Sequence, residues 1–119
     1  MQKKKTGKLF EFCCLAPAII SGSNHKIQKE MKISGEEIGL LFQIADDFLD
    51  QKGKKKNVGK HVNKDKKKGK STLIKLVGYN KTFEFALRRK KLIINKLKKY
   101  GTKSKKLIST VNFILNRSY

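Results

Sequence analysis

Residues 38–50 combine an apolar helical stripe with a cluster of aspartates, and this combination constrains the fold more than any other feature of the chain. The apolar side chains recur at the i, i+3, i+4, i+7 spacing of one helix face. They are Ile38, Leu41, Phe42, Ala45, Phe48 and Leu49. The polar side of the same helix carries Gln43, Asp46, Asp47 and Asp50. The rest of the chain shows no convincing strand alternation, so the sequence predicts an all-α fold in a single domain.

The aspartate cluster predicts a cation site. At about 100° per residue, Asp46 and Asp50 lie about 40° apart around the helix axis, one turn from each other. Neighbouring carboxylates repel one another, and the helix macrodipole disfavours negative charge near a helix C-terminus. Oxygen ligands on one helix face suit a hard ion such as Mg²⁺, which keeps several waters and shares its shell with substrate phosphates. The alternative is an acidic helix end that is solvated and pairs loosely with nearby lysines.

The start of this helix is open to two interpretations. Ser34–Glu37 reads SGEE, a capping box that favours a helix beginning at Ser34. Residues 25–33 are helical in pattern too, which is typical of one longer helix with a weak point at the serine-glycine pair. Gly53 and the lysine run behind it are expected to end the helix. Residues 53–69 are rich in lysine and glycine, so they predict a long exposed loop.

Three further helices are expected downstream. Residues 71–79 form a short helix that Ser71 caps and that closes near Gly78. A longer helix spans residues 80–101 and ends at its glycine, and the last helix spans residues 104–117. The apolar stripe of the longer helix consists of Phe83, Phe85, Leu87, Leu92, Ile93, Ile94 and Leu97. The stripe of the last helix consists of Leu107, Ile108, Val111, Ile114 and Leu115.

The charge of the chain is high, but it lacks the features of a nucleic-acid reader. The 119 residues carry a formal net charge of +21, which by itself favours an anionic partner such as nucleic acid or lipid. Only Arg88, Arg89 and Arg117 among the 30 basic residues are arginine, although base readout and bidentate phosphate binding favour arginine. No strand carries aromatic residues for base stacking. We therefore expect no specific nucleic-acid partner.

The cysteines and the N-terminal segment bear on the compartment. Cys13 and Cys14 are adjacent, so a disulfide between them would be strained, and two packed thiols in a reducing, cytoplasmic compartment are expected. No stretch approaches the ~20 apolar residues of a membrane-spanning helix. The basic start and apolar residues 9–20 outline a signal peptide, but Glu11 and Pro17 interrupt it. The preferred interpretation is a helix with one apolar face made of Leu9, Cys13, Ala16 and Ile20.

Several short motifs follow one another in a distinctive order along the chain. They are Lys5-Thr6-Gly7, the run GLLFQIADDFLD over residues 39–50, Gly59-Lys60, Asp65, and Gly69-Lys70-Ser71-Thr72. In residue type, order and spacing they resemble the trans-isoprenyl diphosphate synthases, most closely the bacterial farnesyl or geranylgeranyl diphosphate synthase type. The FQxxDDxxD block with GK and GKST behind it is highly specific, whereas a DDxxD alone would not be. The resemblance extends essentially from Lys5 to Arg117.

The resemblance implies a fold and an activity. The fold would be a partial helical bundle of the isoprenoid synthase type. The activity would be the condensation of an allylic diphosphate with isopentenyl diphosphate by a Mg²⁺-dependent prenyltransferase. Asp46, Asp47 and Asp50 match the second aspartate-rich motif, which in the family binds Mg²⁺ that bridges to the allylic diphosphate. Asp46 is the strongest candidate for direct ligation.

The resemblance also implies roles for residues outside the aspartate motif. Lys5 matches a family lysine that contacts the same diphosphate, and Lys60 and Lys70 match two further diphosphate lysines. Residues 53–70 would therefore be a flexible active-site loop. Thr6 and Gln43 match positions that face the developing allylic cation. Breaking the carbon–oxygen bond leaves pyrophosphate behind, so metal and lysine stabilise the leaving charge while oxygen dipoles stabilise the cation.

The chain also departs from the family pattern. Family members are much longer and carry a first aspartate-rich motif on an earlier helix, but the four aspartates of this chain are already assigned. Lys54 replaces an acidic residue that often follows the motif glycine. We therefore expect a C-terminal portion of a synthase that is not active alone and needs the N-terminal half. A homodimer, a non-catalytic partner subunit of a full-length synthase, and a basic nucleic-acid or lipid-surface binder are the alternatives.

Overall fold

The computed structural model describes residues 2–56 and 72–117, with the side chains of residues 2–4 and 55–56 excepted. Its elements are α1 (Gln2–Ile20), α2 (His25–Lys56), α3 (Leu73–Val77), α4 (Tyr79–Lys98), the 3-10 helix η1 (Gly101–Ser104) and α5 (Lys105–Asn116). The described residues contain no strand. The predicted all-α fold is confirmed.

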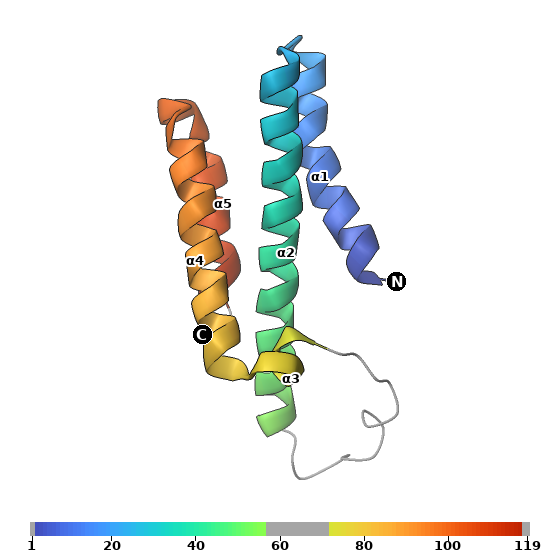
Figure 1. The fold of residues 1–119 in the computed structure, drawn as a ribbon, viewed down its shortest axis with the longest axis vertical. Coiled ribbons are helices and arrows are strands. Elements are labelled where there is room, and N and C mark those ends of the chain that lie inside the picture. Colours follow the sequence, from blue (N-terminus) through green and yellow to red (C-terminus); the bar gives the residue numbers. More distant parts are fainter. Residues whose placement is uncertain (1, 57–71, 118–119) are drawn as a thin grey trace.

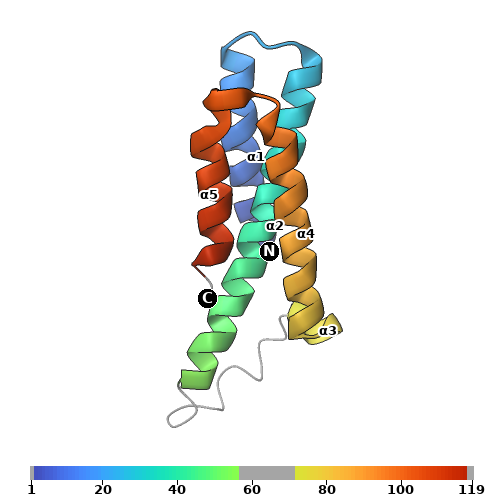
Figure 2. The same ribbon diagram turned by 90° about the vertical axis from the view of Figure 1, so that its left-hand side faces the viewer.

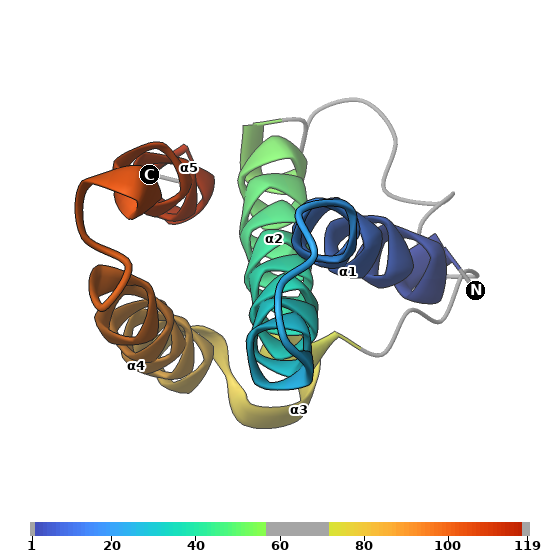
Figure 3. The ribbon, with the colours of Figure 1, turned by 90° about the horizontal axis from the view of Figure 1, so that it is seen from above.

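The central element is α2. Figure 1 shows α1 on one side of this helix and α4 with α5 on the other. Figure 2 shows α4 and α5 in front of α2, and Figure 3 shows this pair across α2 from α1. Accordingly, α2 packs against α1, α4 and α5. The arrangement is a partial helical bundle, and the aspartate cluster lies on its central helix.

The apolar core fills the space between α2, α4 and α5. The predicted stripe of α2 is largely confirmed, because Ile38, Leu41, Ala45 and Phe48 are buried. Its other two members, Phe42 and Leu49, are partly buried. Phe48 is 1 % exposed and packs edge-on against a tyrosine and a phenylalanine of α4. The predicted stripe of α5 is confirmed too. Its fully buried members are Val111, Ile114 and Leu115.

The predicted stripe of α4 is partly wrong. Ile93 and Leu97 are buried, but Leu87 and Leu92 are among the exposed apolar side chains. A helix buries only the arc that faces its neighbours, and these two leucines lie outside that arc. The arc is completed by smaller residues that hydropathy alone does not select. These are Thr82 and Ala86.

Of the two interpretations of the α2 start, the single long helix is correct. Ser34 is buried inside the helix and caps nothing, and Asn24 caps the true N-terminus by accepting a backbone N–H at 3.0 Å. Gly35 is required for close packing, because a Cβ there would lie 2.6 Å from the carbonyl oxygen of Phe10. The prediction that Gly53 and the lysine run end the helix is wrong for Gly53, since α2 continues through it into the lysine run as far as Lys56. An isolated glycine costs a helix only ~1 kcal/mol and does not have to break it.

The N-terminal segment is helical as preferred, but the expected buried face is wrong. Leu9, Cys13 and Ile20 are exposed, and Pro17 is accommodated within the helix. The prediction of two packed thiols therefore fails for Cys13. The side of α1 that turns toward the core carries Phe10, Cys14 and Ala18. Among residues 2–56 and 72–117, no helix has the length and apolar content of a membrane span.

The boundaries of α3 and α4 are close to those expected. Thr72, not Ser71, caps α3, because its Oγ1 accepts the backbone N–H of Lys75 at 3.3 Å. Ser71 itself lies outside the described residues. Gly78 closes α3 with φ +90°, and Gly101 follows α4 with φ +66°. Both positive φ values lie where glycine is favoured, so these two turn positions are explained by residue type.

Three ion pairs join α2 to α4 and to Lys99 directly after it, and the longest links Arg89 to Glu37 Oε1 at 3.9 Å. The Nζ of Lys96 donates to Glu37 Oε1 at 3.2 Å. Lys99 and Tyr100 both donate to the same oxygen of Glu30, each at 2.5 Å. The hydrogen bond from Lys99, reinforced by the one from Tyr100, holds the pKa of the Glu30 carboxyl below its usual range.

Candidate active site

The site begins where α1 and α2 approach each other through glycines. A Cβ on Gly39 would lie 3.1 Å from the Cα of Gly7, so the two backbones are almost in contact. A Cβ on Gly7 would lie 3.9 Å from Nε2 of Gln43. A side chain on Gly39 would press on the α1 backbone, whereas a Cβ on Gly7 would make only ordinary van der Waals contact. The local sequence therefore brings the start of α1 beside Gln43.

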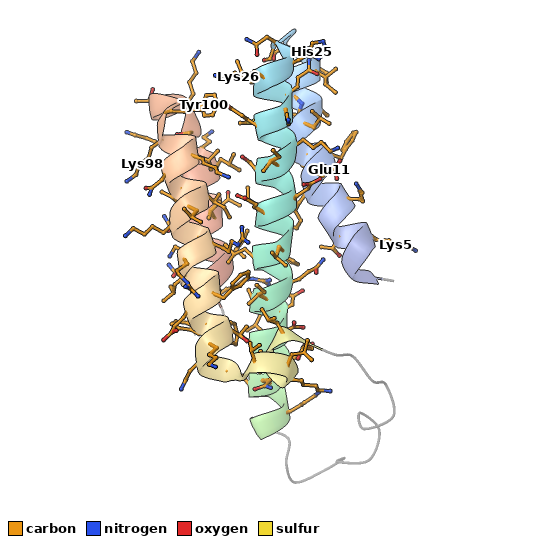
Figure 4. The ribbon with its side chains drawn as sticks, viewed as in Figure 1. Lys5, Glu11, His25, Lys26, Lys98 and Tyr100 are labelled. Atoms are coloured by element: carbon orange, nitrogen blue, oxygen red, sulfur yellow. The ribbon has the colours of Figure 1, made fainter. Side chains whose placement is uncertain are left out.

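The predicted residues of α1 behave differently from one another. Thr6 is partly buried and precedes the glycine that approaches Gln43. The two residues that the resemblance assigns to the allylic cation thus lie near the same helix contact. Lys5 is exposed, and Figure 4 shows its side chain on the outer side of α1, away from α2. The structure does not bring Lys5 toward Gln43.

The aspartates lie on the polar side of α2, with Asp46 and Asp47 one turn and Asp50 two turns beyond Gln43. Asp46 and Asp47 are partly buried and Asp50 is exposed. The macrodipole argument for a cation is weaker than expected, because α2 continues to Lys56 and the dipole effect fades beyond the last turn. The repulsion between neighbouring carboxylates remains. No ion pair from a lysine to Asp46 or Asp50 is formed among the described side chains.

The sequence does not predict the residue that pairs with Asp46. Arg117 Nη2 donates to Asp46 Oδ1 at 2.6 Å. The same guanidinium lies over the ring of Phe42, with Cζ 4.3 Å from the centroid, and Nε donates to the Ile114 carbonyl at 3.3 Å. The sequence feature that could have indicated this role is the rarity of arginine in a lysine-rich chain, because the planar guanidinium suits carboxylate pairing and ring stacking. The pairing partner is 71 positions away and cannot be found from sequence.

The carboxylates of α2 can supply part of the coordination shell of a hard divalent cation. Within the described side chains, no three His, Cys, Asp or Glu residues gather closely enough to hold a metal ion alone. Asp46 has one oxygen paired with Arg117, and its side chain is 48 % exposed. Asp50 is exposed one turn along. Two carboxylates that leave most of the shell to water and phosphate are the arrangement that Mg²⁺ uses beside substrate phosphates, so the residues fit.

Two of the predicted lysines are not placed by the structure. Lys60 and Lys70 lie outside the described residues, as does Asp65. Of the predicted site residues, Gln43 lies beside Gly7, which directly follows Thr6. The three aspartates share the polar side of one helix.

Comparison with known proteins decides the family. The polyprenyl synthetase family matches residues 1–112. The chain belongs to this family. The resemblance predicted from the motifs is thereby confirmed, together with the helical fold that it implied.

The relatives include several prenyl diphosphate synthases. Geranylgeranyl pyrophosphate synthase 4 of Arabidopsis thaliana is 37% identical over 97% of this chain and 31% of its own length. Heterodimeric geranylgeranyl pyrophosphate synthase large subunit 2 of the same plant is 35% identical over 96% and 31%. Farnesyl diphosphate synthase of Bacillus subtilis is 32% identical over 82% and 34%. The chain thus spans about a third of these relatives, and no solved structure matches it significantly.

Proposed function

We propose that this chain forms part of the active site of an isoprenyl diphosphate synthase, which transfers an allylic group to isopentenyl diphosphate. The observation that carries the proposal is the polar side of α2. There Gln43 lies beside the start of α1, and the aspartates of a polyprenyl synthetase sequence follow one to two turns further along the helix. This side faces the diphosphate end of the substrate, and the buried side of the same helix supplies the rigid support that a site needs.

The chemistry assigned to each residue follows from the charges that develop. Asp46 and Asp50 would hold Mg²⁺, with Asp47 beside them, and the bound ion would neutralise the diphosphate as it leaves. Lysines contribute the remaining positive charge. Lys5 would reach the diphosphate only by turning inward from its exposed position on α1.

The hydrocarbon end of the substrate needs dipoles rather than charges. Thr6 and Gln43 are polar and uncharged, so their oxygens would stabilise an allylic cation without trapping it as a nucleophile would. Lys60 and Lys70 complete the set of diphosphate lysines that the resemblance implies. Residues 53–70 would then act as a loop over the diphosphate.

The outer face of α1 supports the involvement of a further helical unit. Phe12 is 66 % exposed and Leu9 is 61 % exposed, and Ile19 and Ile20 continue this apolar surface toward the end of the helix. A contiguous apolar patch of this kind marks an interaction surface. The further unit would supply the remaining acidic ligands and the isopentenyl diphosphate site. It would belong either to the same polypeptide or to a second one.

A non-catalytic partner subunit is the second candidate. One relative is the large subunit of a heterodimeric geranylgeranyl pyrophosphate synthase, and the same apolar face of α1 could dock on a complete synthase. This candidate predicts co-purification with a longer homologue and no Mg²⁺-dependent pyrophosphate binding by the chain itself.

The experiment that tests the proposal measures pyrophosphate binding to the 119-residue chain by calorimetry, with and without Mg²⁺. We expect binding to require Mg²⁺ and to be lost in the double variant Asp46→Ala, Asp50→Ala. The matched control is Glu36→Ala, Glu84→Ala, which removes two exposed carboxylates from elsewhere and keeps the binding. If the lysines bind pyrophosphate as a nonspecific basic surface, Mg²⁺ should weaken the binding instead, because it competes for the anion. Salt should then weaken the binding steeply as well.

A further inference from the structure

The C-terminal end of α5 is fastened to the aspartate cluster by one side chain. Arg117 makes three different contacts: an ion pair with Asp46 on α2, a stack on Phe42 one turn earlier, and a hydrogen bond to its own helix at Ile114. Its side chain is 25 % exposed. A guanidinium held by a carboxylate, a ring and a carbonyl is well ordered, so the contact is a defined feature of the fold.

The ion pair uses the carboxylate that the family motif assigns to the cation. Arg117 takes Oδ1 of Asp46, and Oδ2 has no hydrogen-bond partner among the described residues. A divalent cation on the same carboxylate would come within a few ångströms of the guanidinium. Two positive groups at that separation repel each other strongly when they are partly shielded from water. Arginine cannot lose its charge to relieve this repulsion.

We propose that Arg117 and the divalent cation compete for Asp46, so that cation binding loosens the C-terminal end of α5 from α2. This inference rests on the proposed function, since it takes Asp46 as a cation ligand. Arg117 is here a positioning residue. It neutralises one carboxylate of a repelling cluster, and it couples the occupancy of the site to the docking of the last helix.

The test measures Mn²⁺ binding to the 119-residue chain at physiological ionic strength by electron paramagnetic resonance, which counts the free ion. Arg117→Gln should tighten Mn²⁺ binding about fivefold, the scale expected for a half-exposed ion pair. Arg88→Gln removes the same charge from an exposed arginine of α4 that has no acidic partner among the described side chains. It should leave the affinity within about twofold, because distant surface charges are screened.

Two further variants separate this inference from the proposed function. Asp46→Asn should lower the Mn²⁺ affinity and abolish the difference between Arg117 and its glutamine variant. If Arg117→Gln behaves like Arg88→Gln while Asp46→Asn still lowers the affinity, the competition is wrong and the cation site stands. If Asp46→Asn has no effect on Mn²⁺ binding in either background, the cation site assigned to Asp46 is wrong, and the competition fails with it.

A second measurement reads the coupling to α5 directly. Saturating Mg²⁺ should accelerate amide hydrogen exchange in the last turn of α5 in the unmodified chain, because Arg117 then releases Oδ1. The same addition should change nothing in Asp46→Asn. Unchanged or slower exchange with Mg²⁺ in the unmodified chain would overturn the release of the helix end.

Discussion

The two sides of α2 are packed by different means. Toward α4 and α5 the helix buries large apolar side chains, with Leu41 and Phe48 at their centre. Toward α1 it presents Gly35 and Gly39, and the neighbouring backbone comes within the distance that a single Cβ would occupy. One side therefore removes apolar area from water, and the other side brings two backbones together.

The two sides of α2 therefore contribute differently to the stability of the fold and to the geometry of the candidate site. Burial of apolar side chains supplies most of the free energy of folding. The glycine contact sets the spacing between the start of α1 and Gln43, with Phe10 stacked on Phe42 beside it. The apolar residues of α1 that do not meet α2 remain on its outer face, led by Phe12. We infer that the α4–α5 side contributes mainly stability, whereas the α1 side adds close backbone positioning to its own apolar packing.

The largest expected effect comes from the core side. Phe48→Ala removes a fully buried ring from the contact between α2 and α4, and it should lower the free energy of unfolding by about 3–5 kcal/mol. Urea denaturation followed by circular dichroism measures this loss. The matched control is Phe113→Ala, which removes an exposed ring of α5 and should cost less than about 0.5 kcal/mol. Equal losses for the two variants would contradict the placement of the core.

The next effect tests the glycine side. Gly35→Ala places a Cβ 2.6 Å from the Phe10 carbonyl oxygen, so the backbone of α1 has to move. We expect the free energy of unfolding to fall by about 1–3 kcal/mol, although alanine is the better helix former. Gly53→Ala in the same helix meets nothing within 4 Å and should raise it by up to ~1 kcal/mol. The same sign for both variants would show that helix propensity, and not the close contact, decides the outcome.

The comparison of the two sides also shows what the sequence could predict. The stripe containing Leu41 and Phe48 was found because burial on one side of a helix leaves a periodic record in residue type. The sequence does not predict which face of α1 is buried, because α1 has apolar residues on both sides and periodicity cannot choose between them. The buried face of α1 is decided by Gly35 and Gly39 of α2, because the backbone of α1 can approach closely only where α2 has no side chain.

The candidate site likewise has features that the sequence predicts and features that it does not. The helix, the aspartates and the relation of Gln43 to them are local, so spacing alone placed them on one side of α2. Contacts between distant segments leave no such record. Spacing did not indicate that Arg117 meets Asp46, or that Lys5 projects from the outer side of α1. The interruption of α2 at Gly53 was overestimated, because packing and neighbouring residues can carry a helix through a single glycine.

The smallest expected effect concerns the Glu30 clasp, the two hydrogen bonds that Lys99 and Tyr100 donate to Glu30 of α2. These hydrogen bonds keep the pKa of Glu30 in the folded chain below its value in the unfolded chain. The carboxylate therefore contributes stability that is fully present above its ordinary pKa of about 4.3 and is lost as pH falls through the folded-state pKa. Glu30→Gln should lower the melting temperature slightly at pH 7, and the two melting curves should converge in acid.

The control for this variant is Glu84→Gln, which changes an exposed carboxylate of α4 that has no partner among the described side chains. Its melting temperature should follow that of the unmodified chain from neutral to acid pH. The clasp effect is small because both Glu30 and Lys99 are reached by water, which screens their attraction. A difference between Glu30→Gln and the unmodified chain that persists in acid would mean that the glutamate contributes through its shape and not its charge. The charge of Glu30 would then add nothing to the contact between α2 and α4, which apolar packing and the ion pairs of Glu37 would hold.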